Sequence, residues 1–485
     1  MIDKNVIIIG GGLAGLTTAA YLAKAGIPVQ VFEQHVVPGG YVSSFKRKGY
    51  TFPAGPTCFG SNGVIFPILD ELGLYNKESY IRAGHQISWE NHDIPLETPR
   101  QSYQDIANCF PNENRSLKRY FNWVGVGGSA FNDLLKSGMM FGHNVFRAIL
   151  RVVYHHPLFP WASWKANKNT NRSLHAQYFK NPYLKQLLNQ LGYPVMAGKN
   201  TLGMWASYYY DSWVPIGGMQ SISDELVRYI NEKGGQVHFG NRIKKIKVDH
   251  GQVTGVEVQD AEFIAANWVV SASDLNQTCF ELIERKHIPS STIRKLNKTR
   301  PSESIFSVFL GLKDSPELTV ALKRFQGSHV VFTCADEKYI QLVLLSKDDK
   351  TAAPDGKHAL FIGLLSPYED WETTKGMPQA YAIQKAAYIE DLIKRGEEFI
   401  PGLRVHIEVQ EAASPLTYER YTSNWRGSTA GWNWDPNYAP HFDFAKDIPI
   451  KNFYSVGHYV HNPGGVPTAM ITAWYISKEI IKLKK

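Results

Sequence analysis

Three glycines near the start of the chain stand at a spacing that can hold a phosphate group. Gly10, Gly12 and Gly15 follow an apolar run, residues 6–9, that is typical of a buried parallel strand, and they open a helical pattern. In such a turn the first glycine permits the bend, the second lets a pyrophosphate approach the backbone, and the third packs on the strand. The helix N-terminus then faces the phosphate charge. Glu33, 18 residues beyond Gly15, can accept hydrogen bonds from an adenosine ribose and would repel a 2′-phosphate.

A second group of candidate residues lies in an aromatic tract, residues 201–213, which contains Trp205, Tyr208, Tyr209, Tyr210 and Trp213. Such density is typical of a tunnel wall for a long apolar substrate, and equally of a packed sheet core. Asp211 is the only carboxylate in the tract, which makes it a candidate acid or base. We also place Tyr209 among the catalytic candidates.

The glycine turn alone cannot distinguish NAD from FAD, but the residues after Glu33 can. The stretch EQHVVPGGYVSSFKRKGYTFPAGPT, residues 33–57, combines a Gly-Gly pair with later glycine, aromatic and Gly-Pro positions. It resembles the flavin-binding N-terminus of the amine oxidase and phytoene desaturase superfamily. The resemblance implies FAD as the cofactor. In this part of the chain it implies FAD contacts at Gly10, Gly12, Leu13, Ala14, Gly15, Glu33, Gln34, Gly39, Gly40, Tyr41, Pro56 and Thr57.

The end of the chain carries a second flavin signature. NFYSVGHYVHNPGGVPTAMITAW, which begins at Asn452, is similar to the closing motif of the phytoene desaturase, carotenoid isomerase and retinol saturase group. His458 stands where many relatives have an acid, and His461 matches a histidine of several relatives. We expect His461 beside the flavin ring as a catalytic candidate, or else as a histidine that satisfies a loop carbonyl. Within this motif, which includes Pro463, the resemblance implies flavin contacts at Gly457, His458, Gly465, Val466 and Pro467.

A third block, residues 215–275, has a helical pattern followed by strand patterns. In the resembling family this block returns to the FAD domain. The resemblance implies an adenine contact at Ile243 and a strand end near the cofactor at Ser271 and Ala272, although all three residues would also suit a sheet core. Two positions depart from the family pattern: Tyr41 replaces the usual Arg or Lys, and Pro53 replaces the usual Asp.

These blocks together predict an α/β fold with α+β inserts. The resemblance implies a discontinuous Rossmann-like FAD domain of the glutathione reductase-like type, made of residues 1–70, 215–283 and 448–485. The first insert, residues 71–214, is expected to be helical and aromatic. The second insert, residues 284–447, contains three apolar strand-like runs, which predict a mixed sheet that covers the flavin and binds substrate.

Positive charge is concentrated in residues 115–185, where eleven Lys or Arg residues accompany one acid, Asp133. The segment also carries more bulky apolar residues than a phosphate-binding face needs, so nucleic acid is not the expected partner. We expect a peripheral membrane contact that gives a hydrophobic substrate access to the site. The alternative is a substrate-domain helix with a solvated basic face.

Other features exclude several classes of protein. The four cysteines are scattered, with no CxxC and no Cys/His cluster, so we expect no disulfide framework, no metal site and a reducing compartment. The first residues lack the pattern of a signal peptide, and no apolar run reaches the roughly 18 residues of a membrane span. We therefore expect a protein on the cytoplasmic side, either soluble or peripheral to a membrane.

The leading functional hypothesis is an FAD-dependent oxidoreductase that acts on a long hydrophobic polyene or isoprenoid. The family's reactions are desaturation, saturation and cis–trans isomerisation. A flavin amine oxidase is the first alternative, disfavoured because no acidic cluster is present. A non-enzymatic escort protein for prenylated partners is the second, disfavoured because the glycines and Glu33 are intact. A block that resembles carotenoid isomerase relatives adds Tyr418 and Arg420 as candidate pocket residues, with a structural role as the favoured alternative.

Overall fold

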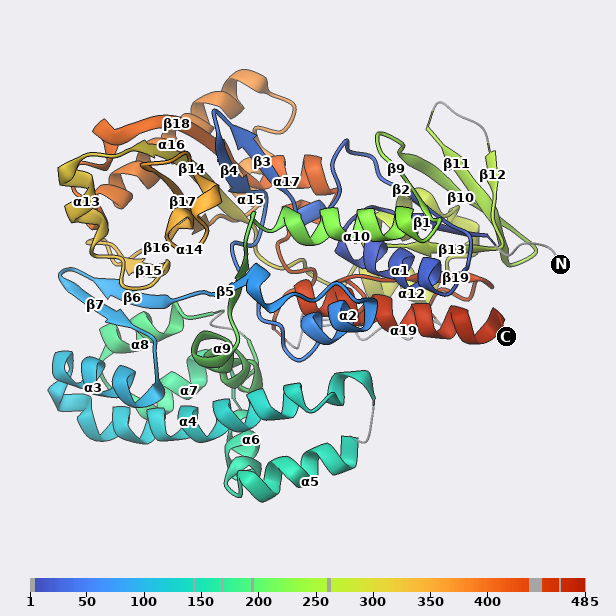
Figure 1. Cartoon of the computed structure of the whole chain (residues 1–485). Coiled ribbons are helices and arrows are strands. Elements are labelled where there is room, and N and C mark those ends of the chain that lie inside the picture. Colours follow the sequence, from blue (N-terminus) through green and yellow to red (C-terminus); the bar gives the residue numbers. More distant parts are fainter. Residues whose placement is uncertain are drawn as a thin grey trace.

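A parallel sheet built from three distant parts of the chain forms one side of the molecule (Figure 1). The computed structural model describes residues 5–142, 145–167, 169–192, 196–259, 263–435, 447–461 and 464–484. The sheet has the strand order β19 (Phe453–Ser455), β13 (Trp268–Ser271), β1 (Val6–Ile9), β2 (Val29–Phe32) and β9 (Gln236–His238). The start, middle and end of the chain therefore meet in one sheet.

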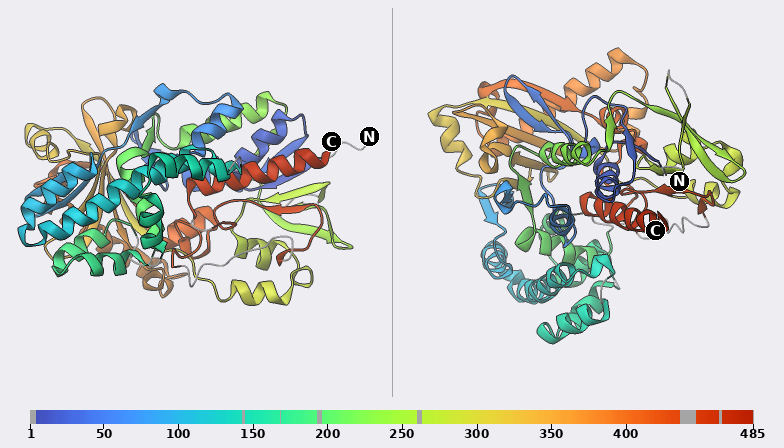
Figure 2. Two further views of the ribbon diagram at one scale, coloured as in Figure 1. Left: turned by 90° about the horizontal axis from the view of Figure 1, so that it is seen from below. Right: turned by 45° about the vertical axis from the view of Figure 1, so that its right-hand side comes forward.

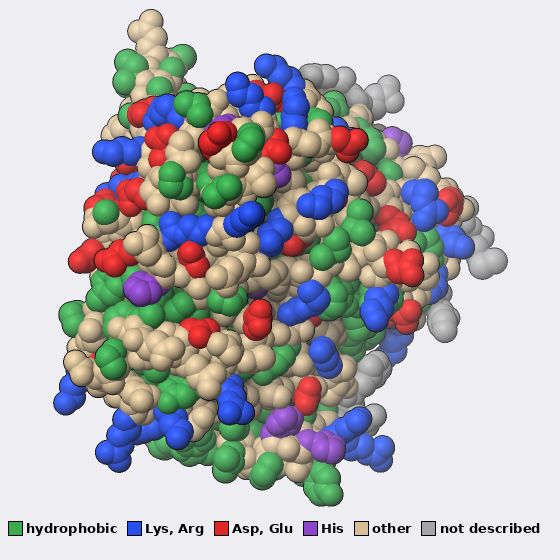
Figure 3. All heavy atoms as spheres, turned by 60° about the vertical axis from the view of Figure 1, so that its left-hand side comes forward, with side chains coloured by type: hydrophobic (Ala, Val, Ile, Leu, Met, Phe, Trp, Pro, Cys, Tyr) green, Lys and Arg blue, Asp and Glu red, His purple; other side chains and the backbone are tan. Residues whose placement is uncertain are grey.

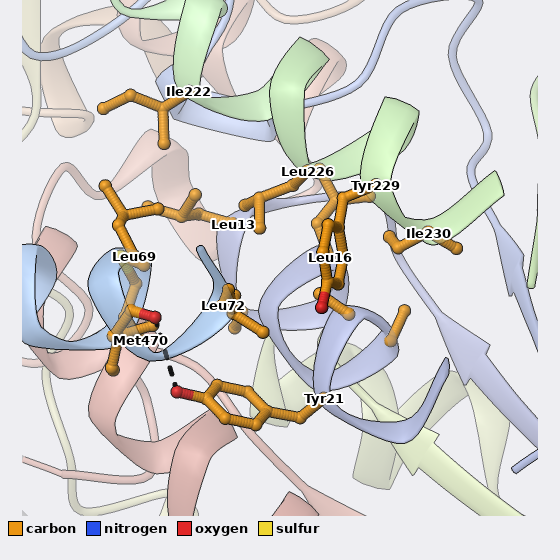
Figure 4. Packing of buried hydrophobic residues seen from close by; sticks show 14 of the residues in the cluster. Leu13, Leu16, Tyr21, Leu69, Leu72, Ile222, Leu226, Tyr229, Ile230 and Met470 are labelled. Atoms are coloured by element: carbon orange, nitrogen blue, oxygen red, sulfur yellow. Dashed lines mark hydrogen bonds between the residues drawn. The ribbon is translucent and has the colours of Figure 1, made fainter. Parts of the chain in front are cut away.

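Both faces of this sheet are covered, as the continuous apolar run of β1 requires. Val6 and Ile8 face the helices α1 (Leu13–Lys24), α2 (Ile65–Leu72), α10 (Gln220–Glu232) and α19 (Val466–Lys484). Figure 4 shows side chains of these helices pointing toward one another in that core. Ile7 and Ile9 face the opposite way, toward the antiparallel sheet of β10 (Ile243–Asp249), β11 (Gln252–Val258) and β12 (Phe263–Ala265).

A mixed seven-stranded sheet forms the second large sheet of the molecule. Its strand order is β18 (Ile407–Ala413), β14 (Ile305–Lys313), β17 (Lys357–Leu365), β16 (Tyr339–Leu344), β15 (His329–Thr333), β6 (His85–Trp89) and β7 (His92–Pro95). Neighbours pair antiparallel except β15 and β6, which are parallel. Helix α16 (Pro378–Phe399) packs on one face. The β6–β7 hairpin comes from residues before 100, so the first insert also contributes strands to this sheet.

The hairpin of β3 (Ser44–Arg47) and β4 (Tyr50–Pro53) lies against the other face of the seven-stranded sheet. Tyr50 and Phe52 pack there with Phe309 and Phe361. A short ladder of β5 (Tyr80–Arg82) and β8 (Trp213–Pro215) frames the beginning and end of the helical insert. The residues just after β4 are thereby held between the two sheets.

Helices fill the lower part of the molecule in Figure 1, and further views are given in Figure 2. They are α3 (Pro99–Cys109), α4 (Asn114–Lys136), α5 (Val145–His155), α6 (Phe159–Asn167), α7 (Asn171–Tyr178), α8 (Pro182–Asn189) and α9 (Gly198–Tyr210). Residues 201–210 of the aromatic tract lie in α9, whereas Trp213 begins β8. The buried positions of the helical part recur at helical spacing: Thr201, Leu202, Trp205, Ala206 and Tyr209. Within the described ranges, no helix is both long and apolar enough to cross a membrane.

Candidate active site

A cavity of about 1410 Å³ lies between the parallel sheet and the seven-stranded sheet. Its lining comes from the turns after β1 and β2, the segment after β4, β14, β17, α17 (Pro415–Thr422) and the start of α19. This volume exceeds the roughly 300–1,000 Å³ of common small-ligand pockets. The cavity therefore has room for a large cofactor together with a second molecule.

The turn between β1 and α1 forms one wall of the cavity. Gly10 has φ +99°, a conformation that side-chain-bearing residues rarely adopt. A Cβ on Gly15 would lie 2.0 Å from the carbonyl oxygen of Gly10, so only glycine lets the helix start this close to the strand. Gly12 is open to the cavity, followed by Leu13 and Ala14 at the start of α1. Because the first turn of α1 has no acidic residue, its positive dipole end is available to a phosphate.

Glu33 lies at the end of β2 beside this turn. Its Oε2 accepts a hydrogen bond from the Gly11 amide at 2.7 Å, and its Oε1 accepts one from the His35 amide at 2.8 Å. The side chain is buried yet lines the cavity. A carboxylate has about four acceptor sites, so Glu33 can hold the turn and still accept from a ribose hydroxyl.

The segment from Gly39 to Thr57 continues the wall. Gly39, Gly40, Tyr41, Pro56 and Thr57 all line the cavity. Tyr41, in the place where the resembling family has a basic residue, donates its hydroxyl hydrogen bond to the carbonyl of Gly427 at 3.1 Å. It therefore ties this wall to the opposite segment of the chain, and burial raises its pKa well above the ordinary value.

The closing segment forms the facing side of the site. Gly457, His458, Gly465, Val466 and Pro467 line the cavity. The Gly457 amide donates to Thr472 Oγ1 at 3.0 Å, which anchors the segment to helix α19. Burial lowers the pKa of His458 to about 4. The imidazole is therefore neutral at physiological pH, and this position brings no charge to the site. Pro463 lies outside the described residues.

The seven-stranded sheet supplies an apolar wall whose individual lining residues the sequence did not predict. Ile305, Ser307 and Phe309 occupy every second position of β14, so they share one face of the sheet. All three line the cavity. The other apolar side chains of this wall are Phe45, Phe361, Leu365, Met377 and Leu416. The signal was present as strand-like apolar runs, but the sequence did not show which face of the sheet would meet the cavity. Tyr418 and Arg420 also line it, and the Tyr418 hydroxyl donates to Ser307 Oγ at 2.7 Å.

Comparison with known proteins identifies the family of this chain. Residues 13–481 match the family described as flavin containing amine oxidoreductase. The chain belongs to this flavin-containing family. A 4,4′-diaponeurosporene oxygenase of Staphylococcus aureus (strain MW2) is 26% identical over 507 aligned positions, which cover 98% of each chain. The chain is an FAD-dependent oxidoreductase.

Solved structures agree in fold with this flavoprotein family. An oxidoreductase from Methanosarcina mazei superposes with a TM-score of 0.64 at 16% identity, over 98% of this chain and all of that one. A triple mutant of putrescine oxidase gives a TM-score of 0.66 at 13% identity, over 99% of both chains. At such identities the likeness concerns the mixed α/β fold alone.

The residues present fit FAD. At Gly12 no atom lies within 4 Å of the place where a Cβ would stand, so the backbone of the turn is open to a pyrophosphate there. The α1 amides and Glu33 offer donors and an acceptor for a pyrophosphate and a ribose. Most of the residues that the sequence proposed as flavin contacts line one cavity. Three do not: Gly15 lies beneath the turn, Ile243 is buried in the core behind the sheet, and Ser271 bonds Thr278 Oγ1 at 2.8 Å. Ala272, next to Ser271, does line the cavity.

The three catalytic candidates do not line the cavity, so the structure does not bring them together with the flavin-contact residues. Tyr209 is buried in the helical core, where its ring stacks on Trp205 with centroids 5.3 Å apart. Asp211 accepts hydrogen bonds from the Asn62 amide at 2.6 Å and Trp213 Nε1 at 2.8 Å, so it braces two segments. Desolvation raises its pKa. The His461 side chain is exposed.

Asp274 is a lining residue that sequence reasoning missed. It is buried, and burial raises its pKa. Its carboxylate accepts from the backbone amides of Trp425 at 2.8 Å and Asn276 at 2.6 Å. It joins the end of the parallel sheet to the segment that follows α17. No short motif marks it, because its partner Trp425 lies 151 residues away.

Proposed function

We propose that this FAD-dependent oxidoreductase acts on a long hydrophobic polyene of the carotenoid type. The observation that carries the proposal is the apolar wall of β14 and β17, which continues the cavity beyond the nucleotide-binding turn. The similarity to a diaponeurosporene oxygenase along the whole chain supports the same substrate class. Among desaturation, saturation and isomerisation, we propose desaturation, which is the oxidative reaction of the three, because the relative is named as an oxygenase.

The chain's own residues would bind and orient the cofactor and the substrate, and would exclude water from the site. FAD, when bound, supplies two-electron redox chemistry. The α1 N-terminus and Glu33 would hold its nucleotide part, while Ile305, Phe309 and Phe361 would present an apolar surface to the polyene. Their packing on β3 and β4 keeps this surface fixed.

Two alternatives receive less support. An amine substrate needs a carboxylate that is available to an ammonium group, but the lining carboxylates described by the structure have partners. Glu411 pairs with Arg47 at 2.9 Å, Glu419 pairs with Lys375 at 2.7 Å, and Asp274 binds backbone amides. A non-enzymatic escort role is disfavoured by the intact turn around Gly10 and Gly15.

We also propose that residues 115–185 contact a membrane surface. Helix α5 turns Ala148 and Val152 inward, and its exposed side chains include Phe146 (73% exposed) and Tyr154 (81%) beside Arg147 and Arg151. Further exposed apolar residues follow at Leu158, Trp161 and Trp164. Figure 3 shows hydrophobic and basic side chains together along the lower edge of the molecule. An apolar face flanked by cations suits peripheral binding to anionic lipid, on the cytoplasmic side.

The domain boundaries remain part of the proposal. The five-stranded parallel sheet, with a three-stranded sheet on its second face, supports a glutathione reductase-like FAD domain of residues 1–70, 215–283 and 448–485. The shared core of α1, α2, α10 and α19 supports the same grouping. Residues 284–447, joined by the β6–β7 hairpin, would then form the substrate domain.

The test is anaerobic reduction of the FAD-loaded protein. We expect bleaching of the oxidised-flavin absorption band by an acyclic carotenoid such as 4,4′-diaponeurosporene, with an oxidised polyene detected by mass spectrometry. The same protein mixed with putrescine should keep its oxidised spectrum. Bleaching by putrescine and by no polyene would overturn the proposal in favour of an amine oxidase.

A further inference from the structure

A chain of four side chains leads from the cavity to the protein surface. Thr57 lines the cavity in the segment after β4, and its Oγ1 lies 3.1 Å from Nε2 of His329, the first residue of β15. His329 Nδ1 lies 2.9 Å from Ser328 Oγ, and the Ser328 hydroxyl donates to Asp348 Oδ2. Asp348, the last residue of α14 (Leu345–Asp348), is only half-buried.

The hydrogen positions of this chain follow from its outer end. Ser328 has one hydroxyl hydrogen and gives it to Asp348, so its oxygen accepts from His329 Nδ1–H. We assign the neutral tautomer with its hydrogen on Nδ1, in which the Nε2 lone pair accepts the hydroxyl hydrogen of Thr57. The Thr57 oxygen then keeps its own lone pairs for a donor in the cavity. When Asp348 is protonated, it can donate to Ser328, and every hydrogen bond from Asp348 to Thr57 can then reverse its direction.

The surroundings keep the imidazole uncharged. Burial lowers the pKa of His329 to about 4, opposed in part by the Asp348 carboxylate. His85, on the neighbouring parallel strand β6, has its ring centroid 5.2 Å from that of His329 and bonds Ser212 Oγ at 2.8 Å. Burial, His329 and Arg82 lower the pKa of His85 as well. Cys58, whose thiol pKa burial raises, also lies beside this group. Burial raises the pKa of Asp348, and Ser328, His329, Lys347 and Lys350 oppose that shift.

We propose that Thr57, His329, Ser328 and Asp348 form a proton relay between the cavity and solvent. The inference rests on the proposed function: oxidation of a polyene to a further double bond removes two electrons and two hydrogens. One hydrogen leaves with both electrons to FAD, and the other must leave as a proton. Thr57 Oγ1 accepts that proton as its own passes to His329 Nε2.

The remaining steps conserve protons along the chain. The Nδ1 proton of His329 passes to Ser328 Oγ, and the Ser328 proton passes to Asp348, from which solvent takes it. Thr57 is the catalytic end of the relay, because it alone lines the cavity. His329, Ser328 and Asp348 are positioning residues that act through it.

The first experiment measures the protonation state and hydrogen bonding of His329 in the absence of turnover. In FAD-loaded protein with ¹⁵N-labelled histidine, His329 should stay a neutral Nδ1–H tautomer from about pH 5 to 8. The Thr57→Val variant should shift its Nε2 resonance, because the donor to that nitrogen is lost, while Thr57→Ser should restore it. A His329 that titrates as a cation in this range, or an Nε2 resonance unmoved by Thr57→Val, would overturn the relay.

The second experiment measures flavin reduction by the polyene. Thr57→Val, His329→Gln and Asp348→Asn should slow it by roughly 10²-fold, the lower end of general acid–base effects, and should reduce its solvent isotope effect. Thr57→Ser, which keeps the hydroxyl, should recover most of the rate lost in Thr57→Val, and the exposed control Thr254→Val on β11 should retain the wild-type rate. FAD content and melting temperature identify variants that fail to fold.

The outcomes separate the two claims. A wild-type rate with polyene that Thr57→Val leaves unchanged would overturn the relay and leave the proposed function standing. A wild-type protein that oxidises no polyene would overturn the proposed function, and the relay's role in it, whatever the histidine spectrum shows.

Discussion

The Glu33 carboxylate accepts the Gly11 amide hydrogen at 2.7 Å, so the end of β2 holds the turn that follows β1. The acid that marks nucleotide binding in the sequence is thus also a structural part of the glycine turn. Its second oxygen accepts from the His35 amide, which fixes the start of the next segment. The two strands and their turns form one unit around the cofactor position.

Replacing Glu33 with Ala should lower FAD affinity by about 10–100-fold. The change leaves two buried amides without their charged acceptor, and such hydrogen bonds contribute about 1.5–3 kcal/mol each. Glu33→Gln should have a smaller effect, since it keeps one acceptor. Calorimetric titration of apoprotein with FAD checks this. Equal affinities in wild type and Glu33→Ala would contradict it.

Replacing Gly15 with Ala should destabilise the FAD domain by at least about 1–3 kcal/mol and reduce FAD content. The added Cβ would meet the Gly10 carbonyl oxygen at 2.0 Å. Gly125, on α4, is the matched control, because a Cβ there has its nearest neighbour at 3.7 Å. Gly125→Ala should be neutral or slightly stabilising. Thermal unfolding with flavin release distinguishes the two variants, and equal melting temperatures would refute the steric argument.

His458 should set the flavin reduction potential through its lack of charge. A carboxylate at this position opposes the addition of electrons to a nearby cofactor, so His458→Asp should have a more negative potential than His458→Asn. The pair differs in charge but hardly in shape. Equilibrium reduction against a dye of known potential measures the difference. Identical potentials would show that the side chain does not face the flavin.

His175 should make the stability of the helical insert depend on pH. Its Nε2 lies 2.9 Å from the Tyr120 hydroxyl and its Nδ1 lies 2.7 Å from Asn189 Oδ1, and burial lowers its pKa to about 4. Below about pH 6.5, the ordinary pKa of histidine, His175 binds a proton in the unfolded chain but stays neutral in the folded protein. Stability is therefore complete above that pH and falls by roughly 3 kcal/mol as the pH drops toward 4.

The measurement is urea unfolding of wild type and His175→Gln across this range. The variant removes the titrating group, so it should lose less stability between about pH 6.5 and 4 than wild type. Parallel pH profiles for the two proteins would place the charge-sensitive group elsewhere.

Replacing Phe146 and Tyr154 with Ser should weaken binding to anionic vesicles by at least about tenfold. Each exposed aromatic ring would lose its apolar contact with lipid. Ile383→Ser, on α16, is the control, because Ile383 is 74% exposed but lies on another part of the molecule. Co-sedimentation with phosphatidylglycerol vesicles, with neutral vesicles for comparison, checks this. Equal loss in the control would contradict a specific face.

The nucleotide-binding turn was predictable because its residues are neighbours in the chain. Gly10, Gly12, Gly15 and the start of α1 act through local backbone conformation, and Glu33 follows after one helix and one strand. The FAD assignment and the flavoprotein family followed from such local motifs, and comparison confirms both.

Side-chain direction required the tertiary structure. Tyr209, Asp211 and His461 had suitable chemistry, but α9 turns Tyr209 into the helical core, and His461 is exposed. Ile305 and Phe309 reach the cavity because of the register of β14, which no local pattern determines. Thr57, His329 and Asp348 come from three segments of the chain. Sequence alone therefore determined the cofactor and the family, whereas only the packing of distant segments decided what faces the substrate.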